Sequence, residues 1–91
     1  MLGEDIYKRI KAPEFRPFYL VMASGERVFV RHPDSISFTS TEYKGKRIFG
    51  RSFNVLEIKD GVVVERYISL PMVAQILDEY PLDGSGLQNA G

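Results

Sequence analysis

Residues 15–38 most restrict the fold of this chain, because hydrophobic and polar residues alternate there on both sides of a glycine turn. The run before the turn, 18–23, is apolar and aromatic. The run after it, 27–31, places two valines on one face and charged or aromatic side chains on the other. Alternation with a period of two around a Ser-Gly-Glu turn is typical of a β-hairpin. The sequence therefore predicts a small β domain.

Further β-prone segments follow along the chain. Proline in a His-Pro-Asp bend at 32–34 has no N–H for a ladder, so we expect an interruption of pairing there. The Asp60-Gly61 pair is favoured in two-residue hairpins, and Gly50 predicts a bulge or a close backbone approach. The polar run 44–47 predicts another turn. The segments expected as strands are 18–23, 27–31, 35–39, 48–58 and 62–68.

The two ends of the chain differ from this pattern. Apolar residues recur at helical spacing near the start, with acids first and cations last, which predicts an amphipathic helix over 3–11 that must pack on something else. Residues 73–77 fit either a short helix or a closing strand. We favour the strand, because Val73 and Ile76 are β-branched and the sheet needs its closing partner. Residues 81–91 are glycine-rich and predict a flexible tail.

Composition sets limits on the class of protein. We expect one domain over 1–80, followed by the tail at 81–91. Cysteine is absent, which excludes disulfides, thiolate metal sites and a cysteine nucleophile, and favours a reducing cytoplasm. No apolar run approaches the ~18 residues of a membrane span, and the start of the chain carries acids where a signal peptide is basic. We expect neither export nor membrane insertion.

Charge is unevenly distributed along the chain, although the formal net charge is zero. Residues 1–53 hold ten Lys or Arg and six Asp or Glu, whereas residues 54–91 hold two and six. Such asymmetry can produce a dipolar surface that binds an anion or lets subunits meet head to tail. The alternative is that strand pairing mixes the two halves in space.

A resemblance supports the fold prediction. The segment 13–36 contains Phe15-Arg16-Pro17-Phe18, a glycine hairpin and His32-Pro33, and the β-prone region ends with Val73-Ala74-Gln75-Ile76. Over 3–77 the chain resembles a group of short bacterial proteins with a helix, Pro-Phe-x-Pro-Phe, a His-Pro bend and a terminal Val-x-x-Ile strand. The resemblance implies a fold and no activity. The element order is also similar in topology to the Sm-like small barrel, but the uridine-binding signature of that family is not identifiable here.

We therefore predict a mainly β (α+β) fold. A short N-terminal helix would pack on a strongly bent five-stranded antiparallel sheet or small barrel of Sm-like or SH3-like type. Whether the sheet closes is left open by the sequence.

Catalytic chemistry finds little support in the sequence. His32 is the one histidine, and catalysis would require a partner that no motif identifies. Carboxylates such as Asp34, Glu42, Asp60 and Asp83 are scattered without calcium-loop spacing, so no metal and no cofactor are expected. We expect a non-enzymatic protein, with an enzyme built around His32 and Asp34 as a remaining alternative.

Binding is the better-supported class of function. One segment interleaves cations, which can hold phosphates, with aromatic rings, which can stack bases. Alternatively, Phe49 and Phe53 belong to the core and the cations only solvate a hairpin. The candidate nucleic-acid-binding residues are Tyr43, Lys44, Lys46, Arg47, Phe49 and Arg51.

Protein binding or self-assembly is the function that we expect first. Phe15, Phe18 and Tyr19 form a candidate strip for another protein, or else anchor the linker after the helix to the barrel. The strand at 62–68 would pair with a second copy if it lay at an edge, so a homo-oligomer is left open. RNA or single-stranded nucleic acid is the alternative partner.

Overall fold

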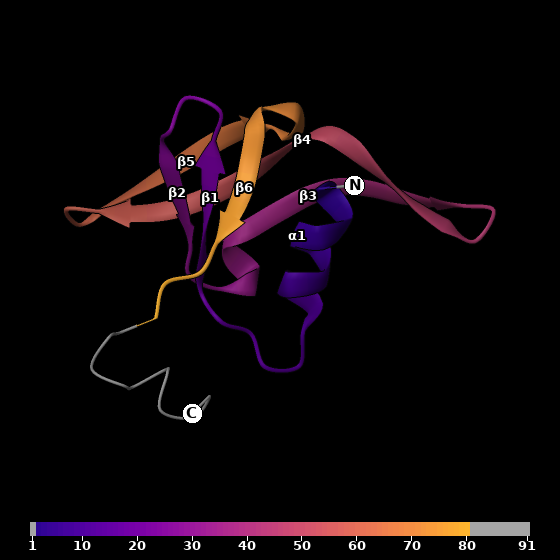
Figure 1. Ribbon diagram of the computed structural model, residues 1–91, viewed down its shortest axis with the longest axis horizontal. Helices are drawn as coiled ribbons and strands as arrows, with labels where there is room; N and C mark the ends of the chain where they lie inside the picture. The colour runs from indigo at the N-terminus through magenta and orange to yellow at the C-terminus, as the bar shows by residue number, and fades with distance from the viewer. Residues whose placement is uncertain (1, 81–91) are drawn as a thin grey trace.

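The computed structural model describes residues 2–80 and is mainly β, with one N-terminal helix and two three-stranded antiparallel sheets (Figure 1). The predicted tail at 81–91 lies outside the described residues. The elements are α1 (Leu2–Lys11), β1 (Phe18–Met22), β2 (Arg27–Val30), the 3-10 turn η1 (Pro33–Ser35), β3 (Ile36–Tyr43), β4 (Lys46–Lys59), β5 (Val62–Ser69), the 3-10 turn η2 (Leu70–Met72) and β6 (Val73–Leu77).

The first sheet has the order β2-β1-β6. The predicted glycine hairpin joins β1 to β2, with Phe18 opposite Val30 and Leu20 opposite Val28. Strand β6 pairs with the other edge of β1, so the expected strand at 73–77 is confirmed. Tertiary pairing with β1 decides between strand and helix there, because the apolar spacing of this segment suits both.

The second sheet has the order β3-β4-β5, and β4 is its central strand with 14 residues. Gly50 lies where the β3–β4 register shifts, and a Cβ at this position would stand 3.2 Å from the carbonyl oxygen of Thr39. The bulge and close approach predicted from Gly50 are both present. Beyond this point the ladder continues to Tyr43 and Lys46, further than the predicted strands reach.

The predicted single five-stranded sheet is not confirmed, and of the open and closed forms that the sequence left open, the structure is not a closed barrel. The η1 turn separates β2 from β3, so the chain leaves the first sheet there and starts the second. Among residues 2–80 no ladder joins the two sheets. A side chain bridges them instead: the Phe29 N–H of β2 donates to Glu57 Oε2 of β4 at 3.1 Å.

The core lies between the two sheets and is completed by α1. Acids in the first turn of α1 and cations in the last turn complement its dipole, as expected. Its Ile6 is fully buried, and Ile10 packs beside the core. The buried apolar residues are Ile6, Phe18, Leu20, Val28, Val30, Ile36, Phe53, Val55, Ile68 and Val73.

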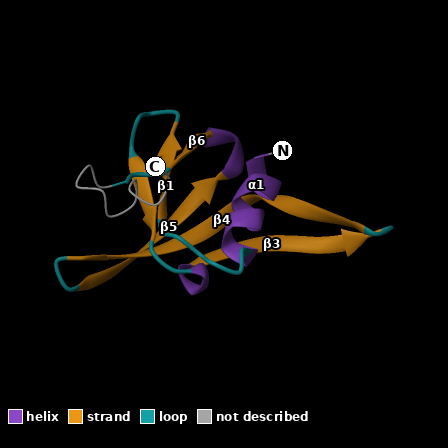
Figure 2. Cartoon of the chain, turned by 60° about the horizontal axis from the view of Figure 1, so that its bottom comes forward, coloured by secondary structure: helices purple, strands orange, loops and turns teal. Residues whose placement is uncertain are grey.

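Two hairpin ends project from the body in opposite directions along its longest axis (Figures 1 and 2). Each is closed by a residue–glycine pair with positive φ, Lys44-Gly45 in one and Asp60-Gly61 in the other, which is the requirement of a two-residue hairpin turn. We call residues 41–51, at the end of β3–β4, the basic arm. Residues 54–67, at the end of β4–β5, are the apolar arm.

Candidate binding surfaces

The apolar arm exposes large hydrophobic side chains on the sheet face that points away from the core. Phe53 and Val55 of β4 point inward. By strand alternation, Leu56 and Ile58 therefore point outward. On the neighbouring strand β5, Val63 lies opposite Ile58 and shares this outward face. Their exposed fractions are 40% for Leu56, 58% for Ile58 and 64% for Val63. This end of the sheet therefore presents an apolar surface on its outward face.

A groove of about 400 Å³ runs between this outward face and the η1 turn. Its floor is apolar and its rim is polar, because the bend after β2 brings charged side chains beside the β4–β5 hairpin. Glu65 lies on the same sheet face, opposite Leu56, and accepts hydrogen bonds from Asn54 and Tyr67. The groove is lined by Arg31, His32, Asp34, Ser35, Leu56, Ile58 and Val63.

A buried carboxylate holds the inner side of the apolar arm. Glu57 is 7% exposed, accepts from Arg66 Nε at 2.6 Å and also accepts the Phe29 N–H. Arg66 in turn contacts Glu26 at 3.0 Å, and its hydrogen bonds to Glu26 and Glu57 raise its pKa above the usual value. The guanidinium thus stays charged and ties the arm to the β1–β2 hairpin.

The basic arm carries the residues predicted to bind nucleic acid, but it divides them between two faces. Arg47 and Phe49 share the inner face, where Phe49 packs against Tyr7 of α1 at 5.4 Å between ring centroids. Tyr43 pairs with Lys46 on the outer face. Tyr43 is 59% exposed.

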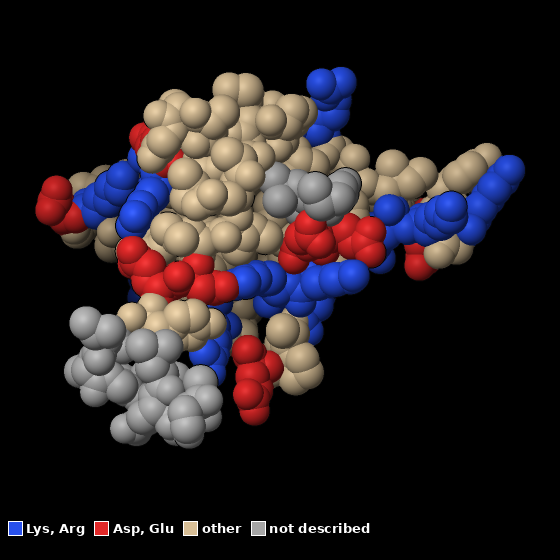
Figure 3. All heavy atoms as spheres, viewed as in Figure 1, with Lys and Arg blue, Asp and Glu red and all other residues tan. Residues whose placement is uncertain are grey.

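The remaining residues of the predicted ribbon occupy different environments. Lys44 lies at the turn, with its Nζ 5.3 Å from the centroid of the Tyr43 ring. Arg51 is exposed near the bulge, whereas Phe53 is buried in the core. Figure 3 shows Lys and Arg side chains gathered along the basic arm at the right of the view.

Helix α1 adds two residues to the basic arm that sequence reasoning missed. The Arg47 guanidinium lies 5.2 Å from the centroid of the Tyr7 ring, and Lys11 Nζ lies 5.6 Å from it. Tyr7 and Lys11 are four residues apart, so they share one side of the helix. That spacing was visible in the sequence, but only the tertiary packing of α1 on Phe49 relates it to the arm.

The predicted strip of Phe15, Phe18 and Tyr19 is not an exposed surface. Phe18 is 1% exposed, and Phe15 packs beside the core with its ring centroid 6.1 Å from that of Phe18. Tyr19 is half-buried against Phe29 at 4.9 Å. These contacts correspond to the alternative in which the rings anchor the linker after the helix.

His32 has a local structural role in the described conformation. Its Nδ1 accepts the Asp34 N–H at 3.0 Å, and its carbonyl accepts the Ser35 hydroxyl at 2.7 Å, so it caps the η1 turn. The side chain is exposed at the rim of the apolar groove. Within residues 2–80, no cluster of three or more His, Asp or Glu side chains is arranged to hold a metal ion.

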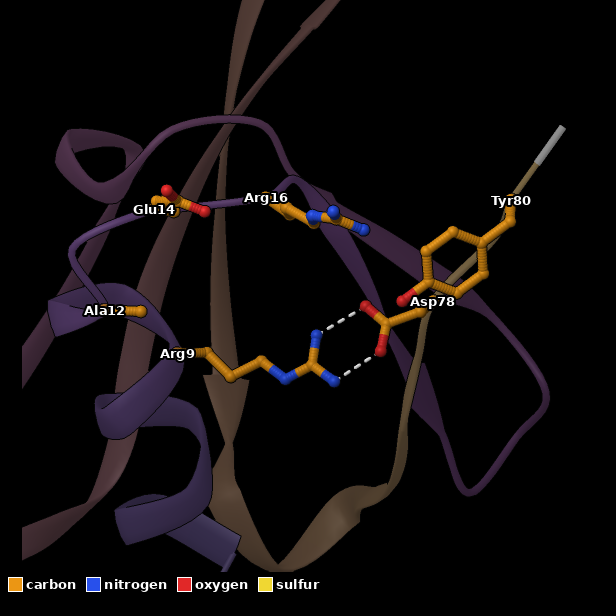
Figure 4. A pocket seen from close by; sticks show the side chains of 6 residues that line it. All are labelled: Arg9, Ala12, Glu14, Arg16, Asp78 and Tyr80. Atoms are coloured by element: carbon orange, nitrogen blue, oxygen red, sulfur yellow. Dashed lines mark hydrogen bonds and ion pairs between the residues drawn. The ribbon is translucent and has the colours of Figure 1, made fainter. Parts of the chain in front are cut away.

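A second cavity, of about 290 Å³, lies where α1 meets the segment after β6 (Figure 4). Arg9 of the helix donates two hydrogen bonds to the carboxylate of Asp78, and this pairing holds the pKa of Asp78 below its ordinary value. Arg16 lies over the ring of Tyr80. Both arginines that line this cavity therefore already have protein partners. The Arg9–Asp78 contact attaches the helix to the segment after β6.

No helix within residues 2–80 is both long and apolar enough to cross a membrane. Comparison with known proteins gave no match, whether to a family model, a curated protein or a solved structure.

Proposed function

We propose that this protein is a binding module that recognises another polypeptide through the groove on its apolar arm. The observation that carries the proposal is the contiguous apolar floor formed by Leu56, Ile58 and Val63 beside a polar rim. Contiguous exposed apolar patches with polar rims mark interaction surfaces. The groove volume also falls in the range of roughly 300–1,000 Å³ that is common for binding sites.

The energetic argument is that a partner removes these side chains from water. Covering the exposed parts of Ile58 and Val63 contributes about 1 kcal/mol for each side chain, at roughly 25 cal/mol per Å² of apolar surface. The rigid two-residue turn and the Glu57–Arg66 pair already hold the arm in place, so little ordering is needed on binding.

Selection from a random peptide display library tests this proposal. Peptides enriched on the wild-type protein should bind the groove, and Val63→Asp should weaken their binding by at least about tenfold, because it places a carboxylate on the apolar floor. The matched control is Ala74→Asp, which adds the same charge at an exposed position of the other sheet. Equal loss in both variants, or no enrichment on the wild type, would contradict the proposal.

A second candidate function is the binding of RNA or single-stranded nucleic acid by the basic arm. The observation that favours it is that Lys44, Lys46, Arg47 and Arg51 lie on a projecting hairpin with a single acid, Glu42. Cations on such an arm can follow a phosphate backbone, and the exposed Tyr43 ring offers one stacking surface.

Fluorescence anisotropy with a labelled oligouridine of about 20 nucleotides tests the second candidate. If all four cations contact phosphates, the logarithm of the affinity should fall with the logarithm of salt concentration with a slope of about −3. Lys44→Glu with Lys46→Glu should abolish binding, whereas Lys8→Glu on α1 should preserve most of it. No binding by the wild type at about 50 mM salt would remove this function.

A further inference from the structure

The outer face of the basic arm has exposed apolar side chains of its own. Thr41 pairs with Ile48, and Tyr43 pairs with Lys46, so these four side chains share the face opposite α1. Ile48 is 50% exposed and Tyr43 is 59% exposed. A projecting hairpin that presents an isoleucine and a tyrosine beside lysines has the form of a ligand for an apolar groove with an acidic rim.

The groove on the apolar arm has acids where such a ligand needs them. Asp60 lies at the hairpin turn, Glu65 lies on the groove face, and Asp34 lies on the rim with its side chain 94% exposed. Arg31 and His32 also line the groove, so the acids are concentrated at the turn and along β5. The apolar arm, residues 54–67, holds three acids and two cations, whereas the basic arm holds four cations and one acid.

We propose that the basic arm of one copy docks in the apolar groove of a second copy. This inference rests on the proposed function and names its partner. In the complex, Tyr43 and Ile48 cover Ile58 and Val63, while Lys44 and Lys46 lie near Asp60 and Glu65 of the other copy. Apolar burial supplies the contact, and the opposite charges set its orientation and speed its formation.

A second copy fits the groove better than nucleic acid does. Phosphates would meet the Asp34 carboxylate on the groove rim, with Asp60 and Glu65 on the neighbouring hairpin, and would leave the apolar floor uncovered. The two arms also project from opposite ends of the body, so an arm cannot fold back onto the groove of its own chain without breaking β4, which belongs to both. Association between copies is the arrangement that satisfies both surfaces.

Charge reversal with mixing tests the inference by light scattering after size exclusion. The wild type should exceed its monomer mass of 10.4 kDa as concentration rises, most strongly at low salt. The arm variant Lys44→Glu/Lys46→Glu and the groove variant Asp60→Lys/Glu65→Lys should each lose at least about tenfold in self-affinity. Their equimolar mixture should associate again, because each restored contact has opposite charges.

Three further variants separate the docking from general charge effects. Lys8→Glu/Arg16→Glu makes the same change in net charge on α1 and the linker after it, away from the basic arm and the groove, and should leave self-association within about twofold of the wild type. Ile48→Asp and Val63→Asp each remove the apolar contact when tested alone. Mixing them should restore one wild-type contact, between the arm of the Val63→Asp copy and the groove of the Ile48→Asp copy, and should therefore give a one-to-one complex and no larger species. Circular dichroism and the unfolding midpoint show whether each variant is folded.

The possible failures are distinguishable. A wild-type protein that stays monomeric at every concentration, or charge-reversed variants that stay monomeric when mixed, would overturn the second copy as partner. If selected peptides still bound the groove in that case, the proposed function would stand with another polypeptide as its ligand. If neither copies nor peptides bound, both proposals would fail.

Discussion

The two hairpin arms have the same construction and opposite surfaces. Both extend β4 beyond the core, and both end in a two-residue turn with glycine at φ +77°. The basic arm packs its inner face on α1 and surrounds its exposed side chains with cations. The apolar arm is tied down by one buried carboxylate and leaves its outward face uncovered. The backbone thus sets where an arm projects, while the outward side chains set what it can bind.

The largest expected effect comes from a substitution in the core that both arms share, because it should destabilise both arms together. Phe53 lies on β4 between them, is 2% exposed and stacks on Phe38 at 4.9 Å. Phe53→Ala should lower the free energy of unfolding by about 4 kcal/mol through lost burial and a cavity. Urea denaturation followed by circular dichroism measures it. A loss below about 1 kcal/mol would show that the shared strand is not part of the core.

A smaller change should loosen the apolar arm alone. Glu57→Ala leaves the Phe29 N–H and one side of Arg66 without a partner, and we expect a loss of about 2–3 kcal/mol, moderated because Arg66 keeps Glu26. Amide hydrogen exchange should speed up in β2 and in residues 54–67 while residues 41–49 keep their protection. Uniform acceleration in both arms would contradict this division.

The two turns offer a matched pair of substitutions. Gly45→Ala and Gly61→Ala place a side chain at the same positive φ, and each should cost about 1 kcal/mol, because open space surrounds both glycines and only the backbone conformation is strained. Gly61→Ala should weaken groove binding, and Gly45→Ala should weaken binding by the basic arm. Thermal unfolding and the peptide and oligouridine assays distinguish them.

The smallest expected effect comes from breaking the Arg9–Asp78 ion pair, which lies outside both arms and should leave them unchanged. Arg9 lowers the folded-state pKa of Asp78 mainly by hydrogen bonding, so this pair contributes stability above the unfolded pKa of Asp78 and loses it as pH falls through the folded value. Asp78→Asn should cost at most about 1 kcal/mol at pH 7, since the pair is partly exposed. Urea titrations at neutral and strongly acidic pH measure the difference, which should vanish in acid. A difference that persisted there would mean that packing, not charge, accounts for it.

Much of the local structure could be predicted from the sequence, because local chemistry determines it. The helix dipole pattern, the Asp60-Gly61 turn and the bulge at Gly50 all appear where their residues require them. Strand alternation around the first hairpin also predicted that Val28 and Val30 share one face, and in the structure both are buried.

The arrangement of the sheets could not be predicted in the same way. The sequence shows a bend at His32-Pro33, but only long-range pairing decides that the chain changes sheets there. The groove was missed because Leu56 and Ile58 look like core residues of a good strand. Their exposure depends on which face of β4 packs on the first sheet: Val55 and Glu57 point toward it, and Leu56 and Ile58 point away, a choice that no local pattern records.

The bulge at Gly50 has a further consequence for the surface of the whole molecule. Three residues of β4, 50–52, stand opposite Thr39 alone, so the insertion relative to a regular ladder is two residues, an even number. Phe49 and Phe53 therefore remain in phase, and both reach Phe38. Removing a single residue from 50–52 would invert the part of β4 in the basic arm relative to the rest of the strand, turning Ile48 toward the helix and Phe49 and Arg47 toward water. Because the number of inserted residues is even, the exposed side chains at the two ends of β4 lie on the same face of the sheet.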